Sequence, residues 1–257
     1  MENNLRTYYK HNMPRFTPIG GTFFITFRTK DSVPAKVMQR IRFDYTDEIK
    51  RIKHKRLPLS TMTLEIRKAR YRYFQKYDNI LDDSAKQNYP LADPEVAKIL
   101  VDKLHELDGK LYDLIAYCVM PNHVHLLVSL ANQTIDKNDC LIDNKELALS
   151  YSPLHEIMRR IKGATSRHIN LHLGLTGQSF WQKDSYDHYV RNAKSLENIW
   201  WYIVNNPVKA GLVSDFENFP HTYWREVLED KAPAEAGATE KGVKSPPAPA
   251  NQSSTAR

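Results

Sequence analysis

The segment YCVMPNHVHLLV, residues 117–128, constrains the fold of this chain more than any other stretch. Two apolar runs flank Pro121 and Asn122, a pair of residues that favours a turn. The pattern predicts an antiparallel β-hairpin whose strands lie near residues 112–119 and 123–130. We expect the other strands and helices to be arranged around this hairpin.

Two histidines stand at the start of the second predicted strand. His123 and His125 are two residues apart, so their side chains should lie on one face of the strand, while Val124 points into the core on the other. Two neighbouring imidazoles can bind one metal ion. A lone His-x-His pair is more often two structural histidines. We favour a metal site because the pair follows a tight turn, lies on a strongly apolar strand and has a candidate nucleophile downstream.

The composition of the 257 residues is that of a globular protein with a basic surface. A net charge of +7 and a pI near 9.2 favour a polyanionic partner, with nucleic acid as the first candidate, although a merely basic surface has the same composition. The only cysteines, Cys118 and Cys140, offer no disulfide framework, which is typical of a reducing cytoplasm. No apolar run has the length of a membrane span, and the first residues lack the apolar core of a secretory signal, so we expect a cytoplasmic protein.

The order of the remaining elements predicts the fold class. Aromatic and β-branched residues predict strands, and periodic apolar residues predict helices. Beside the hairpin, we expect strands near residues 22–28 and 186–190. We expect a loop at 131–151, and helices at residues 35–56, 61–81, 95–108, 153–172 and 193–206. This order matches the split βαβ pattern, which predicts an α+β fold with a ferredoxin-like antiparallel sheet and an enlarged helical first crossover.

Three regions of different composition predict the domain organisation. Residues 1–18 precede the first strand as an N-terminal arm, and we expect residues 19–228 to form one folded domain with a helical insertion at about 35–108. From Lys231 onward the chain contains Ala, Pro, Glu, Lys, Ser and Gly with almost no large apolar residue. A segment of this composition cannot join a core, so residues 229–257 are predicted to be a disordered tail.

A second pair of functional candidates lies on the last predicted helix. At about 100° per residue, its apolar residues gather in one buried stripe. The stripe consists of Leu196, Ile199, Trp200 and Ile203. Tyr202 and Asn206 are four residues apart and should lie together on one flank of that stripe, where a phenol hydroxyl and an amide oxygen can reach a common cleft. The simpler interpretation is a tyrosine at the border of the core and an asparagine that ends a helix before Pro207.

The two pairs, His123 with His125 and Tyr202 with Asn206, together fit a site that cleaves phosphodiester bonds. A divalent ion held by two imidazoles and an amide oxygen could act on the scissile phosphate as a Lewis acid. The tyrosine oxygen would attack phosphorus and form a covalent intermediate, which retains the energy of the bond, so that the strand can be rejoined without ATP. A phenol has a pKa near 10, and an adjacent cation favours its ionised form.

Two motifs in this sequence resemble a known family. Residues 117–128 resemble the His-hydrophobe-His motif of the HUH endonuclease superfamily. The stretches FWQ, DHYVRN and WYIVNNPVKAGLV, between residues 180 and 213, resemble the C-terminal half of REP-associated tyrosine transposases, which are single-tyrosine members of that superfamily. The resemblance covers about residues 19–28 and 110–225, and the joint order of the motifs is specific.

The resemblance implies a ferredoxin-like catalytic domain, Mg²⁺ or Mn²⁺ as cofactor, and cleavage of single-stranded DNA that leaves a 5′-phosphotyrosine and a free 3′-OH. It implies that His123 and His125 bind the metal and that Tyr202 is the nucleophile. Asn206 stands where related transposases place a third, amide ligand, which is often a glutamine. The family recognises short palindromic repeats that fold into hairpins, so single-stranded or hairpin DNA is the expected partner of a monomer or homodimer.

Further basic and aromatic side chains are candidates for DNA contact, through backbone charge and base stacking. They are Arg159, Arg160, Lys162, Arg167, Phe180 and Trp181, and basic residues between 40 and 72 form a second candidate surface. Tyr186 and Tyr189 compete with Tyr202 for the role of nucleophile, since both lie close to His188, a candidate base.

Two other functions stay open at the level of sequence. The chain could be a non-catalytic nucleic-acid-binding module or regulator in which the histidines are structural. His123, His125 and Cys118 could form a zinc site, although the lack of a Cys-rich cluster argues against structural zinc.

Overall fold

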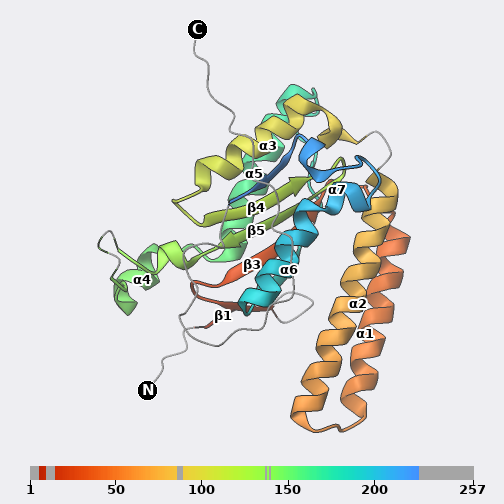
Figure 1. Ribbon diagram of the computed structural model, residues 1–257, viewed down its shortest axis with the longest axis vertical. Helices are drawn as coiled ribbons and strands as arrows, with labels where there is room; N and C mark the ends of the chain where they lie inside the picture. The colour runs from red at the N-terminus through yellow and green to blue at the C-terminus, as the bar shows by residue number, and fades with distance from the viewer. Residues whose placement is uncertain (1–5, 10–14, 86–88, 137, 139, 226–257) are drawn as a thin grey trace, which may run out of the picture. The chain divides into compact units, whose positions relative to one another are not determined.

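The computed structural model describes residues 6–9, 15–85, 89–136, 138 and 140–225 (Figure 1). Its centre is a five-stranded antiparallel sheet with strand order β6-β3-β5-β4-β7. The strands are β3 (Thr22–Arg28), β4 (Asp113–Val119), β5 (His123–Ser129), β6 (Tyr186–Val190) and β7 (Thr222–Trp224). Without β7, this order is that of the split βαβ pattern, which confirms the predicted α+β, ferredoxin-like fold.

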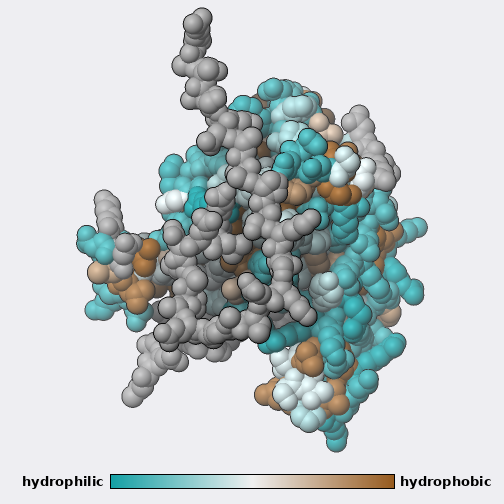
Figure 2. Space-filling model, in the orientation of Figure 1, coloured by the Kyte–Doolittle hydropathy of each residue, from teal (hydrophilic) through white to brown (hydrophobic). Residues whose placement is uncertain are grey.

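Helices occupy both faces of the sheet, and the first crossover is enlarged as predicted. The helices are α1 (Ala35–His54), α2 (Leu59–Ala85), α3 (Pro94–Leu107), α4 (Asn144–Ser150), α5 (Leu154–His172), α6 (Ala193–Val204) and α7 (Asn206–Lys209). Helices α1 and α2 pack against each other as a long hairpin (Figure 1). Its surface is largely hydrophilic, with apolar residues gathered at the free end, where Leu59 is 74% exposed (Figure 2).

The alternation of side chains along β3 and β5 divides the core into two layers. Phe23, Val124 and Leu126 belong to one cluster, which α3 and α5 complete with Leu100 and Ile161. Residues of opposite parity face the other layer, between the sheet and helices α2 and α6. His123 and His125 therefore point into this second layer, on the face opposite Val124, as the hairpin pattern predicts.

The structure differs from the sequence-based expectation at three places. Residues 131–151 contain a 3₁₀ turn at Ala131–Gln133 and helix α4, whose N-terminus is capped by Asp143, so the predicted loop was wrong in part. The aromatic segment near Trp224 forms β7, a three-residue strand too short for its alternation to be recognised. The last helix ends at Val204 and a separate turn of helix begins at Asn206, because Pro207 favours the first turn of a new helix.

The described residues bear on the predicted arm and tail only in part. Strands β1 (Arg6–Tyr9) and β2 (Arg15–Pro18) pair antiparallel within the predicted N-terminal arm. The predicted tail, residues 229–257, lies outside the described residues. None of the helices in the described ranges combines the length and the apolar character that crossing a membrane requires.

Candidate active site

The hairpin brings the two histidines into direct proximity. The Nε2 atoms of His123 and His125 are 3.0 Å apart, and both side chains are fully buried. His123 Nδ1 donates to the Asn122 side-chain oxygen at 2.7 Å, and His125 Nδ1 lies 2.9 Å from the Thr26 hydroxyl. Because these contacts engage the Nδ1 atoms, the two Nε2 atoms are directed towards a common point.

Helices cover this face of the sheet, so both histidines are fully buried. Burial lowers the pKa of His123 well below its usual range and lowers that of His125 to about 3. Both imidazoles are therefore neutral at physiological pH. The neutral form is the one that binds a metal ion, so this electrostatic environment suits a ligand pair.

Helix α2 adds a carboxylate that the sequence analysis missed. Asp78 is 1% exposed, and its Oδ1 lies 3.4 Å from His125 Nε2. Ligand atoms of Asp78, His123 and His125 lie within 4.8 Å of one another, which makes a buried set that can hold a divalent cation. The available sequence signal was the spacing of Asp78 and Asp82, two acidic residues one turn apart in a stretch rich in tyrosine, phenylalanine and leucine.

Lys209, on α7, balances the two buried carboxylates. Its Nζ lies 2.7 Å from Asp78 Oδ2 and 2.8 Å from Asp82 Oδ2. Burial, reinforced by the nearby charge of Asp78, raises the pKa of Asp82 to about 6 despite this ammonium group. Lys209 thus occupies one side of the acidic pair, while Asp78 Oδ1 has no hydrogen-bond partner and faces the histidines.

Tyr202, on α6, lies directly beside this cluster. Its ring is 5.3 Å from the ring of His125 and 5.4 Å from Lys209 Nζ, measured to ring centres. Burial raises the pKa of the Tyr202 phenol far above its usual value, and the charge of Asp78 raises it further, while Asn206 acts in the opposite direction. The Tyr202 hydroxyl is near enough to Asp78 and Asn206 for both to affect its pKa. Its oxygen does not meet the geometry of a full hydrogen bond with either side chain.

Asn206 is the most unusual polar residue of the site. Its side chain is fully buried at the start of α7, and neither its amide oxygen nor its amide nitrogen has a hydrogen-bond partner. An amide buried in this way costs free energy unless something else satisfies it. Tyr202 contacts the His125 ring, and Asn206 is near enough to act on the Tyr202 phenol, so the two predicted pairs lie together in the structure. The Asn206 amide oxygen, which has no hydrogen-bond partner, is free to bind a metal ion.

The alternative site residues are arranged differently. Cys118 lies opposite His125 in the strand register, but its thiol contacts Met120 and Thr222, and burial raises its pKa to about 12. Among the described residues, the group able to hold a metal does not include this cysteine. The zinc alternative therefore lacks a thiolate ligand at this site.

The competing tyrosines lie on β6, outside the histidine cluster. Tyr186 stacks on Phe74 with ring centres 4.5 Å apart, and burial raises its pKa to about 12. Tyr189 packs against Phe23 on the opposite face of the sheet from the histidines. Of the three tyrosines, Tyr202 is the one in ring contact with the His pair.

The candidate DNA-contact residues divide into exposed and buried groups. Arg159, Arg160 and Arg167 are exposed on α5, where Arg159 forms an ion pair with Glu156. Lys162 instead donates to the backbone oxygens of Gln182 and Lys183 and so holds the segment before β6.

Phe180 and Trp181, the candidates for stacking on DNA bases, belong to the core. They are 7% and 4% exposed, and the indole of Trp181 donates to Thr165. Because both side chains are buried under α5, base stacking on them is not expected, and this corrects their candidate role.

Comparison of the chain with family models finds no match. A curated relative from Haemophilus influenzae, which carries the provisional name REP-associated tyrosine transposase, is 30% identical over 128 residues, or 49% of this chain and 67% of the relative. An uncharacterised protein from the same organism is 26% identical over 96 residues, or 36% of this chain and 52% of that protein. A solved structure of a REP-associated tyrosine transposase bound to a REP hairpin aligns over 89% of this chain and 99% of its own at 15% identity, with a TM-score of 0.42.

The ferredoxin-like sheet carries a His-x-His pair beside a tyrosine of α6. Together with this relative, these features define a DNA-binding enzyme of the HUH-type transposase class. The match to that relative covers two thirds of its length at 30% identity. The chain belongs to the family of REP-associated tyrosine transposases.

Proposed function

We propose that this protein cleaves and rejoins single-stranded DNA through a covalent 5′-phosphotyrosine intermediate on Tyr202, in a reaction that requires Mg²⁺ or Mn²⁺. The observation that carries the proposal is the buried cluster of Asp78, His123 and His125 next to the Tyr202 ring. A structural pair of histidines has no need of an adjacent carboxylate and an adjacent unsatisfied amide.

The residues of the site fit a divalent cation. His123 and His125 would supply imidazole nitrogens, and Asn206 an amide oxygen that has no other partner. Asp78 adds a carboxylate oxygen, the ligand type that Mg²⁺ and Mn²⁺ prefer. When bound there, the cation supplies Lewis acidity to the scissile phosphate.

The chemical step follows from the position of Tyr202. Its oxygen bonds to phosphorus as the bond from phosphorus to the 3′-oxygen breaks, and the leaving 3′-oxygen takes a proton to become a hydroxyl. The phenol must first lose its own proton, which burial and Asp78 oppose in the absence of a cation. The Asp78 carboxylate, whose charge acts on that hydroxyl, is the candidate acceptor, and attack by a 3′-hydroxyl on the phosphotyrosine reverses the step.

The substrate is proposed to be a palindromic repeat that forms a hairpin. The name of the Haemophilus relative associates this family with REP sequences. Exposed Arg159, Arg160 and Arg167 supply positive charge on α5 for the DNA backbone. Action on DNA also agrees with the expected cytoplasmic location, and monomer and homodimer are both compatible with the proposal.

The test uses labelled single-stranded DNA from the sequences that flank the gene of this protein. We expect cleavage and a covalent protein–DNA adduct with Mn²⁺ or Mg²⁺, and neither with EDTA. Tyr202→Phe should still bind DNA but form no adduct, whereas Tyr186→Phe, a matched loss of a buried hydroxyl, should still form it. Mass spectrometry of the wild-type adduct locates the modified residue. An adduct on Tyr186 or Tyr189 would refute the assignment of the nucleophile, and cleavage without any adduct would refute the covalent mechanism.

A further inference from the structure

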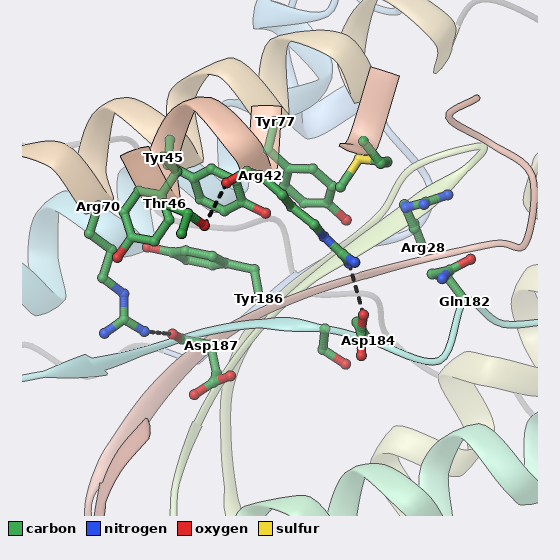
Figure 3. Close-up of a pocket in the computed structure, with 13 residues that line it drawn as sticks. Arg28, Arg42, Tyr45, Thr46, Arg70, Tyr77, Gln182, Asp184, Tyr186 and Asp187 are labelled. Atoms are coloured by element: carbon green, nitrogen blue, oxygen red, sulfur yellow. Dashed lines mark hydrogen bonds and ion pairs between the residues drawn. The ribbon is translucent and has the colours of Figure 1, made fainter. Parts of the chain in front are cut away.

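A second hollow lies outside the histidine site, between the α1–α2 hairpin and the segment that leads into β6 (Figure 3). Its cavity volume is about 130 Å³, and because one water occupies about 10–15 Å³ on this measure, a phosphate group with part of its nucleotide can enter. Arginine and tyrosine side chains dominate its lining, among them Arg28, Arg42, Arg70, Tyr45 and Tyr73.

Arg28 is a buried charge without a counter-charge. The residue is 4% exposed, and its guanidinium donates to the Ser32 hydroxyl at 3.2 Å and to the Thr29 backbone oxygen at 3.4 Å. These partners and the nearby Tyr77 phenol are neutral, and no carboxylate within the described ranges lies at ion-pair distance from this guanidinium. A buried, unpaired cation is costly, so Arg28 points to an anion as the missing partner in the cavity that it lines.

The other two arginines are available to the same anion. Arg42 pairs with Asp184 at 2.8 Å, but both side chains are more than one third exposed, and such exposed pairs contribute little and exchange readily. Arg70 donates to the backbone oxygen of Asp187 at 2.6 Å. Asp184 and Asp187 are the acidic residues of the lining, against three arginines, so positive charge is in excess.

Tyrosine rings form the rest of the wall. The rings of Tyr45 and Tyr73 are 4.9 Å apart, and the Arg70 guanidinium lies 5.8 Å from the centre of the Tyr186 ring. Figure 3 shows the rings of Tyr45 and Tyr186 on one side of the hollow and the Arg42 guanidinium directed towards Asp184. Cations that bind phosphate next to aromatic faces that stack on bases are the combination by which proteins hold single-stranded nucleic acid.

We propose that this pocket binds one nucleotide of the DNA strand, with its phosphate between Arg28 and Arg42 and its base against the tyrosine rings of the helical hairpin. The helical insertion, through α1 and α2, would then be part of the DNA-binding surface. The inference rests on the proposed function only in that DNA is the substrate, and does not depend on metal binding or cleavage.

The position of the pocket agrees with this role. The segment that contains Gln182, Asp184 and Ser185 lines both this pocket and a neighbouring groove along α5. That groove is also lined by Arg159, one of the exposed arginines proposed to contact DNA. A strand that follows α5 can therefore pass from this groove into the nucleotide pocket.

The experiment compares two arginines of α1. Arg42 lines the pocket, whereas Arg40 points to solvent and pairs with Asp44, so Arg40→Gln is a control that also removes one charge and one ion pair with an aspartate. Binding of fluorescent single-stranded DNA is measured by anisotropy in EDTA, over a range of salt concentrations. Thermal melts establish that both variants are folded.

We expect Arg42→Gln to weaken binding about tenfold at low salt and to reduce the slope of log affinity against log salt by about 0.7 units, the value for one phosphate contact on a single strand. Arg40→Gln should stay within about twofold of wild type. Equal affinity and slope for the two variants would overturn the proposal. Because no cleavage is measured, failure of the pocket and failure of the nuclease mechanism give different results.

A crosslinking arm separates a nucleotide from a simple anion. Oligonucleotides that carry 5-iododeoxyuridine are irradiated with the protein, and we expect crosslinked peptides that contain Tyr45, Tyr73 or Tyr186. Inorganic phosphate, added at constant ionic strength, should compete only weakly with the oligonucleotide. Full competition by phosphate, with no crosslink to these tyrosines, would mean that the pocket holds a free anion and would refute the nucleotide assignment.

Discussion

Replacement of Asn206 by alanine separates a metal ligand from a structural asparagine. In the structure, both polar atoms of this side chain are buried without a hydrogen-bond partner. A structural role would require such bonds, and a ligand role would not. The variant should therefore affect the protein with metal and the protein without metal in different ways.

The size of each effect follows from the environment of Asn206. An unpaired buried amide costs about 1–3 kcal/mol, which the truncation removes. The cavity left behind, roughly 30–40 Å³, costs about 1 kcal/mol at about 24 cal/mol per Å³. Without metal, we expect Asn206→Ala to be as stable as wild type or more stable by up to about 2 kcal/mol.

The metal-bound state should respond in the opposite direction. A ligand that binds only the folded protein at about 100 times its Kd stabilises it by about 2.7 kcal/mol. Loss of one contact to a metal lowers affinity by about 10- to 100-fold, so the variant should lose about half or more of this gain. Urea titrations followed by circular dichroism, in EDTA and in Mn²⁺, measure both quantities.

Asn170→Ala is the matched control. Asn170 is 5% exposed, and its amide donates to the Gln178 backbone oxygen at 2.6 Å. We expect this variant to lose about 1–3 kcal/mol in EDTA and to keep the full stabilisation by Mn²⁺. If Asn206→Ala behaves like Asn170→Ala in both media, Asn206 is a structural residue and the ligand assignment is wrong.

His125→Ala should abolish metal binding and cleavage. It should also lower the free energy of unfolding by about 2–4 kcal/mol, because this side chain is buried against Phe24. A urea titration in EDTA that finds wild-type stability would contradict the packing argument. Burial, with the charges of two arginines, lowers the pKa of His188 to about 4 in the folded protein, so the unfolded chain binds its proton first as pH falls from about 6.5. His188→Gln should therefore lose less stability than wild type between pH 7 and pH 4.5, and an equal or larger loss would show that the sign is wrong. Arg159→Ala combined with Arg160→Ala should flatten the salt dependence of DNA binding by about one unit per lost phosphate contact; an unchanged slope would place the surface between residues 40 and 72 instead.

The burial of His125 shows what strand alternation in the sequence can and cannot predict. The alternation of the strand predicts the face on which His123 and His125 lie, and the structure has them on that face. Alternation carries no information about what covers a face. Helices α2 and α6 cover this one, so we expect removal of either imidazole to open a cavity and to destabilise the fold.

Local periodicity was sufficient for the hairpin, for the four-residue spacing of Tyr202 and Asn206, and for the order of elements that specifies the ferredoxin-like sheet. Each of these depends on neighbours within a few residues, and hydrophobic spacing reports such neighbours directly. The three-residue strand β7 and the break before Asn206 fell below the length that such spacing can resolve.

The full set of side chains around the histidines depended on contacts between distant parts of the chain. Asp78 precedes His123 by 45 residues and reaches it only because α2 packs on that face, and Lys209 meets Asp78 from α7. Packing of α5 on the other face buries Phe180 and Trp181, and α1 and α2 assemble the pocket of Arg28 and Arg42 with the edge of the sheet. Residues that meet through tertiary packing share no period in the sequence, so their partnership exists only in the folded chain.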